Sequence, residues 1–244
     1  MGMSLLLGLP GDILALVVIV LMPAELCDAW TCEALRAMCG SCRALRALFA
    51  ETRAAFTGTY VHVDSPMVCA SAHRAGLSFD PGQLSARVAR DFSLFPQMHS
   101  LIASSSSGVS RTHRAARIDL ASVEMYTSLL LRCAALDASA YWTRRVTDLR
   151  IVGSWLGTCS EIAAFANLRT LALVECRCHT VAGLDELAID SLAIDGLAFY
   201  AKRNDGQYVG PVIDVGHEFV APILRVRKLV VRNTPVLATL FSYV

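Results

Sequence analysis

The chain has 244 residues with 22 basic and 21 acidic side chains, so its formal net charge of +1 favours neither nucleic acid nor an anionic membrane surface as a partner. Hydrophobic residues make up 55% of the chain and charged residues 18%, and the mean hydropathy is +0.49. These values exclude a wholly disordered chain and leave two explanations: much of the surface is covered by a partner or membrane, or the chain packs as a stack of repeats.

The first predicted element is an N-terminal helix. Ten apolar residues run without a break from Ile13 to Met22, which is about half of what a membrane-spanning helix needs but suits the core of a signal peptide. A signal peptide opens with positive charge, whereas this chain has no Lys or Arg before Arg36. A helix in a folded protein explains the details better, with Pro10 in the first turn and Asp12 near the positive end of the helix dipole. Such a helix is apolar all round and needs cover on every side.

The same region carries a motif. It runs Leu9, Pro10, Gly11, Asp12, Ile13, Leu14, then Val17 and Leu21, a break at Pro23, and a second helical stretch ending Met38, Cys39, Gly40, Ser41, Cys42, Arg43, Ala44, Leu45. This pattern resembles the F-box, which has a Leu-Pro opening with an acidic residue and Ile-Leu, a first helix, a short break and a Val-Cys-Lys-x-Trp-Arg-x-Leu close. The sequence departs from it at Gly40, at Cys42 and in a longer stretch between the helices.

The resemblance implies that residues 5–49 form a short helical module that docks on the Skp-type adaptor of a cullin-RING ubiquitin ligase. Apolar helices near a terminus also suit docking on a partner on physical grounds. The expected adaptor-binding residues are Leu9, Pro10, Ile13, Leu14, Val17 and Leu21.

The nine cysteines favour a reduced intracellular compartment over a secreted disulfide scaffold, because their number is odd and the chain is long. Two groups invite a zinc site: Cys39 with Cys42, and Cys176 with Cys178 and His179. Neither has a second pair at the spacing that structural zinc usually requires. We therefore expect buried free thiols, and no metal or other cofactor.

The remainder, residues 56–244, is predicted to contain repeated strands. One segment, Leu168, Leu171, Leu173 and Cys176, follows the LxxLxLxxC pattern of a leucine-rich repeat. The frame recurs one unit earlier at Val146, Leu149, Ile151 and Ser154, and one unit later at Ile189, Leu192, Ile194 and Leu197. The central leucines 149, 171 and 192 give periods of 22 and 21 residues, within the range of this repeat.

Looser copies flank these three units. They comprise Met98, Leu101 and Ala103, then Ile118 with Leu120, then Val226, Leu229 and Val231, with Tyr60 to Val63 as a possible first strand. Residues 104–110 and 202–216 read as insertions, the second with an Asp205-Gly206 step that suits a hairpin. Residues 161–165 suit a helical return arm ended by Asn167, and residues 239–244 are expected against the last strand or on a partner.

No enzyme motif is present. The chain has no GxxxxGK[ST] phosphate loop, no GxGxxG between a strand and a helix, no HExxH and no GxSxG, and its six histidines are dispersed. We therefore expect a binding protein and no catalytic residue.

In a repeat of this kind, the residues between the inward leucines project from the sheet. Arg150 should then lie beside Ala172, and Ala172 beside Ala193. The charged members of this face are the candidates for binding a target protein: Arg150, Arg169, Asp190, Asp195 and Arg227.

The sequence thus predicts an α/β protein: a short N-terminal helical F-box-like module (5–49) followed by an irregular leucine-rich repeat solenoid with a parallel sheet (56–244). The expected function is a cytoplasmic or nuclear substrate-recognition subunit of a cullin-RING ligase, with an adaptor and an unknown target as partners and no membrane contact. One alternative is a leucine-rich repeat scaffold whose N-terminus is a signal or membrane anchor, without a ubiquitin link. Another is a structural subunit of a large assembly.

Overall fold

The computed structural model describes residues 25–27, 47, 50, 57–64, 81–105, 129–137, 140–156, 159–184, 186–202, 208–209, 223–224, 226–234 and 242–243. The predicted adaptor-binding residues between Leu9 and Leu21 lie outside these ranges, as does the repeat copy at Ile118 and Leu120. The CxxC pair, Cys39 and Cys42, lies outside them as well.

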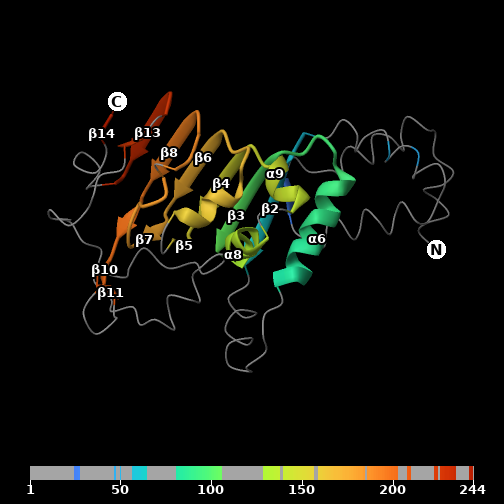
Figure 1. Cartoon of the computed structure of the whole chain (residues 1–244), viewed down its shortest axis with the longest axis horizontal. Helices are drawn as coiled ribbons and strands as arrows, with labels where there is room; N and C mark the ends of the chain where they lie inside the picture. Colours follow the sequence, from blue (N-terminus) through green and yellow to red (C-terminus); the bar gives the residue numbers. More distant parts are fainter. Residues whose placement is uncertain are drawn as a thin grey trace, which may run out of the picture.

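A seven-stranded parallel sheet dominates the fold (Figure 1). Its strands, in spatial order, are β1 (Glu25–Cys27), β2 (Thr59–Asp64), β3 (Ser100–Ser105), β4 (Asp148–Val152), β6 (Thr170–Val174), β8 (Ser191–Asp195) and β13 (Lys228–Arg232). Every neighbouring pair is parallel, and the spatial order follows the order along the chain. The predicted mixture of helices and a parallel sheet is therefore confirmed.

Side chains alternate between the two faces of the central strands, as the repeat frame predicts. Leu149 and Ile151 on β4 are buried, and they align with Leu171 and Leu173 on β6. The next strand continues both rows with buried apolar residues. The predicted register is also confirmed on the opposite face, where Arg150 pairs with Ala172 and Ala172 with Ala193.

Each central strand ends in the same turn. The residue after the strand has a positive φ in all three cases: 66° at Gly153, 50° at Glu175 and 70° at Gly196. The amide N–H of each donates to a carbonyl on the following strand, at 2.7 to 3.1 Å. The turn sends the chain into a second, smaller parallel sheet formed by β5 (Trp155–Leu156), β7 (Arg177–Cys178) and β9 (Ala198–Phe199).

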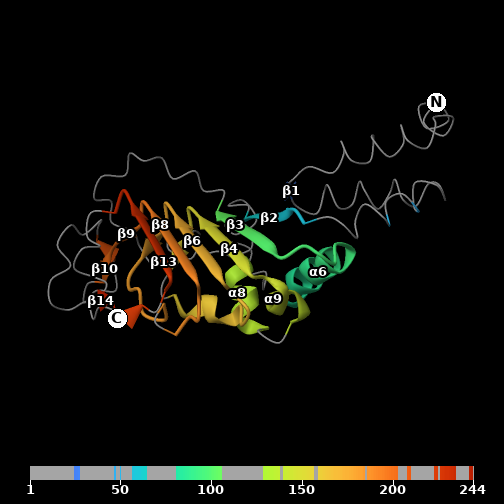
Figure 2. The ribbon, with the colours of Figure 1, turned by 90° about the horizontal axis from the view of Figure 1, so that it is seen from above.

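The helices cover one face of the large sheet (Figure 2). They are α6 (Pro81–Leu94), α8 (Leu129–Leu136), α9 (Tyr141–Arg145) and the 3-10 helix η1 (Ser160–Ala164). The return arm predicted for residues 161–165 is thus a short 3-10 helix, followed by a turn at Asn167. A chain of aromatic rings ties the helices to the sheet: Tyr60 to Phe92 at 5.6 Å, Phe92 to Trp142 at 6.3 Å, and Trp142 to Phe165 at 5.8 Å.

Two expectations need correction. The strand at Thr59–Asp64 is the second of the sheet, because β1, which lies inside the predicted N-terminal module, pairs with it in parallel. At the opposite end of the sheet, the inward side chains of β13 are not fully buried, since Val231 is 37% exposed. An inward position keeps its side chain dry only if another layer covers it.

Two small sheets complete the described part. β10 (Ala201–Lys202) and β11 (Tyr208–Val209) pair antiparallel, which agrees with the predicted hairpin, although its Asp205-Gly206 step lies outside the described residues. β14 (Ser242–Tyr243), from the apolar C-terminal tail, pairs with β12 (Ile223–Leu224) and not with the last strand of the large sheet.

Candidate functional site

The face of the sheet that points away from the helices is the candidate binding surface, and we call it the outer face. It is built by alternate residues of β3, β4, β6, β8 and β13, aligned in three rows. The rows are Ser100, Asp148, Thr170, Ser191, Lys228; then Ile102, Arg150, Ala172, Ala193, Val230; then Ser104, Val152, Val174, Asp195, Arg232.

The centre of the outer face is small and mostly apolar. Ala172 and Ala193 lie side by side in the middle row, with Val152 and Val174 aligned in the next row. Small side chains let a partner approach the strands closely, while the exposed guanidinium of Arg150 offers hydrogen-bond donors beside them. The arrangement suits recognition of a protein surface by shape, with charge at the margins.

The five predicted target-binding residues divide into three places. Arg150 is in the middle row of the outer face, and Asp195 is at the end of β8, where its Oδ1 accepts a hydrogen bond from Asn233 Nδ2 at 2.8 Å. Arg169, Asp190 and Arg227 each lie one residue before a strand, and consecutive backbone hydrogen bonds of 2.8 and 3.0 Å link them. The structure therefore brings three of the five together at the N-terminal ends of β6, β8 and β13.

Two of these three residues, Asp190 and Arg227, form an exposed ion pair. Arg227 Nε lies 3.5 Å from Asp190 Oδ1, with side chains 89% and 53% exposed. A pair this open to water contributes little to stability. Its side chains are consequently available to exchange partners with a bound protein.

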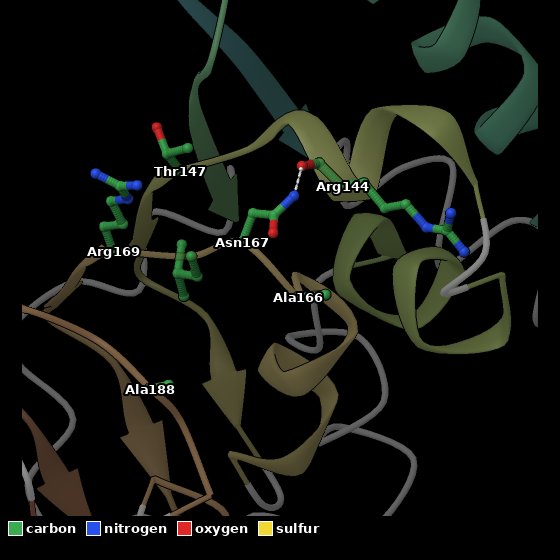
Figure 3. Close-up of a pocket in the computed structure, with 7 residues that line it drawn as sticks. Arg144, Thr147, Ala166, Asn167, Arg169 and Ala188 are labelled. Carbon is green, nitrogen blue, oxygen red and sulfur yellow. Dashed lines mark hydrogen bonds between the residues drawn. The ribbon is translucent and has the colours of Figure 1, made fainter.

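Sequence reasoning did not find the shallow pocket near the same strand ends, which has a volume of about 380 Å³ (Figure 3). It is lined by Arg144, Thr147, Ala166, Asn167, Leu168, Arg169 and Ala188. Asn167 Nδ2 donates to the carbonyl of Arg144 at 2.6 Å and ties two successive turns of chain together. Figure 3 shows the guanidinium of Arg169 on the side of Thr147, while that of Arg144 points the opposite way. The sequence indicated Asn167 only as the end of the return arm at residues 161–165, and it gave no signal for the pocket.

Buried cysteines lie in the turns behind the sheet, and their thiols are unreactive. Burial raises the pKa of Cys159 and of Cys176 to about 12, and that of Cys178 well above its ordinary value of 9.0. Cys176 Sγ donates to the carbonyls of Ile151 and Val174, at 3.4 and 3.5 Å. These thiols stay protonated at neutral pH and are poor nucleophiles.

The zinc arrangement weighed for Cys176, Cys178 and His179 does not form. In the described ranges no cluster of three His, Cys, Asp or Glu side chains could hold a metal ion. Both thiols are buried, and His179 Nδ1 lies 3.0 Å from the carbonyl oxygen of Tyr200.

The scaffold beneath the site depends on one arginine. Arg145, at the end of α9, donates to the carbonyls of Phe92, Phe95 and Met98 at 2.6, 2.9 and 3.0 Å, and also to that of Pro96. Helix α6 has no basic residue in its own last turn, so this guanidinium supplies the positive charge that its C-terminal end favours. The arginine thereby fixes the helical layer just before β4 begins.

Within the residues that the structure describes, the helices are too short or too polar to span a membrane. Comparisons of this chain with protein-family models, with curated proteins and with solved structures found no match.

Proposed function

We propose that this chain is a non-catalytic recognition protein of the leucine-rich repeat type, which holds a target protein on its outer face. One observation carries the proposal: strands that recur every 22 and 21 residues pair in parallel, in chain order and in equivalent register. In repeat folds of this kind each turn contacts only its neighbours, and the stacked strands form an extended binding surface.

The repeated details support the same conclusion. Ser154, Cys176 and Leu197 follow the strands at the position where the repeat pattern has Asn or Cys, and all three are buried. Arg177 N–H donates to the carbonyl of Ser154, and Ala198 N–H to that of Cys176, both at 3.0 Å. A local sequence motif thus coincides with a repeated hydrogen bond, which is what a repeat architecture requires.

We further propose that the protein is the substrate-recognition subunit of a cullin-RING ubiquitin ligase in the cytoplasm or nucleus, as the F-box resemblance of residues 5–49 implies. Leu9, Ile13 and Leu14 would anchor a Skp-type adaptor. The outer face would hold the target so that its lysines lie near the ligase's charged E2. Catalysis would then come from proximity supplied by the partner enzymes, with no reactive group of this chain.

Co-purification of the full chain with its adaptor tests this proposal. Changing Leu9, Ile13 and Leu14 to Asp should abolish adaptor recovery, because charged side chains cannot fill an apolar interface. The matched variant Arg150→Glu, on the exposed outer face, should keep the adaptor and lose the target. Adaptor recovery that survives the triple change would refute the docking claim.

A second measurement separates the recognition claim from folding. Arg150→Glu and Arg169→Glu should leave the urea midpoint of unfolding nearly unchanged, since substitutions of exposed side chains cost within about 0.5 kcal/mol. A large loss of stability would make these residues structural. A chain found in a membrane pellet would instead favour the anchored scaffold.

A further inference from the structure

We propose that the open edge of β13 is a second binding site, which takes up an acidic, extended segment of another protein by strand addition. This site goes beyond the outer face and does not depend on the ubiquitin link. The backbone of β13, its incomplete burial and its charge support this site.

β13 is the last strand of the large sheet and pairs only with β8 among the described strands (Figure 2). Lys228 N–H donates to the carbonyl of Asp190, and Gly196 N–H donates to the carbonyl of Arg232. Because the backbone groups of a strand alternate in direction, the N–H and C=O groups of Lys228, Val230 and Arg232 face β8. Those of Leu229 and Val231 point away from it.

The inward side chains of β13 are left partly uncovered. On β8, the aligned Leu192 and Ile194 are 0% and 1% exposed, whereas Leu229 is half-buried and Val231 is 37% exposed. One further strand at this edge would shield the exposed flank of these side chains with its own inward residues and would pair with the outward backbone groups. A sheet edge with such groups is a ready template for another chain.

The charge of β13 determines which kind of peptide segment can pair with it. Residues 226–234 carry Arg227, Lys228 and Arg232 and no acidic side chain, and all three basic side chains are exposed. An added strand places its side chains beside those of its neighbour, so Glu or Asp opposite Lys228 and Arg232 would be favoured. A second copy of this chain is disfavoured, because antiparallel pairing about a two-fold axis would set Lys228 against Arg232 of the other copy.

The direct test uses the full chain and two labelled synthetic peptides, one of alternating Glu and Val and one of alternating Lys and Val. Fluorescence polarisation should show binding of the acidic peptide only, weakening as salt rises. The double variant Lys228→Glu with Arg232→Glu should lower its affinity by about tenfold or more and admit the basic peptide. Equal binding of both peptides would overturn the proposal.

Strand addition is separated from simple ion pairing by removing backbone donors. Val231→Pro deletes an N–H that points away from β8, so the ladder survives, but peptide affinity should fall by about tenfold. The acidic peptide methylated on alternate backbone nitrogens should lose affinity to the same extent on the unaltered chain, which keeps the test decisive if the proline variant fails to fold. Undiminished binding in the methylated peptide would overturn strand addition, as would a homodimer in sedimentation that Val231→Pro abolishes.

Discussion

Gly183 offers the sharpest test of how the turns of chain stack behind the sheet. It has a φ of +94°, and a Cβ added there would lie 2.7 Å from the backbone nitrogen and 2.9 Å from the Cα of Ser160. Gly196 has a similar φ of +70°, but its added Cβ would meet nothing closer than 3.6 Å. The pair therefore separates backbone strain, which both share, from a collision with the preceding turn, which only Gly183 has.

The magnitudes follow from these two geometries. An L residue in the left-handed region costs roughly 1–2 kcal/mol, of which the lower entropy of the unfolded Ala chain offsets about 0.4–1. Gly196→Ala should accordingly destabilise by about 1 kcal/mol. The collision at Ser160 adds about 1–3 kcal/mol, because backbone atoms cannot move aside as a flexible side chain can. Gly183→Ala should therefore lose about 2–4 kcal/mol.

Urea unfolding followed by tryptophan fluorescence measures the difference, since Trp142 and Trp155 are both buried and should respond to loss of the core. The comparison holds if the two variants unfold with the same dependence on urea. Equal losses for Gly183→Ala and Gly196→Ala would refute the close approach of the two turns. A larger loss at Gly196 would refute the strain argument as well.

Two further predictions concern the scaffold. Arg145→Met should lower the free energy of unfolding by about 2–4 kcal/mol in urea titration, because several carbonyls at the end of α6 lose a charged donor. The control Arg144→Met, at the exposed neighbouring residue, should change it by no more than about 0.5 kcal/mol. Similar losses in both variants would contradict the role of Arg145. The buried thiols, with pKa values of about 12 for Cys159 and Cys176, should contribute stability that is complete below pH 9 and is lost as pH rises from about 9 towards 12, because the unfolded chain releases the thiol protons first. Replacing both by Ala should flatten that part of the pH profile, and an unchanged slope would contradict thiol ionisation as its cause.

Much of the sheet could be predicted from the sequence because its signal is local. Apolar residues alternate within each strand, and the same frame returns after 22 and 21 residues, so the register of Arg150, Ala172 and Ala193 could be given before any coordinates. The same frame assigned Arg169, Asp190 and Arg227 to the exposed face together with Arg150 and Asp195, and the structure then placed these three side by side just before their strands. Their gathering into one place is a consequence of parallel pairing in register.

The pocket beside Asn167 and the hydrogen bonds of Arg145 to the end of α6 were not predictable in that way. Arg145 and Asn167 are ordinary polar residues in the sequence, and each acquires its role from carbonyls far away along the chain or on the preceding turn. Hydrogen bonds between distant segments leave no period for sequence reasoning to detect.

The sequence by itself determined which residues of each central strand face inward, because a two-residue alternation assigns every side chain to a face once one is known. Only the tertiary structure decided where the sheet begins and ends. Glu25–Cys27 became its first strand, and the inward row of β13 stayed open at Val231. The physical reason is that the burial of a side chain depends on the element packed against it. The strand pattern shows which face is apolar, and only the folded chain shows whether another element covers that face.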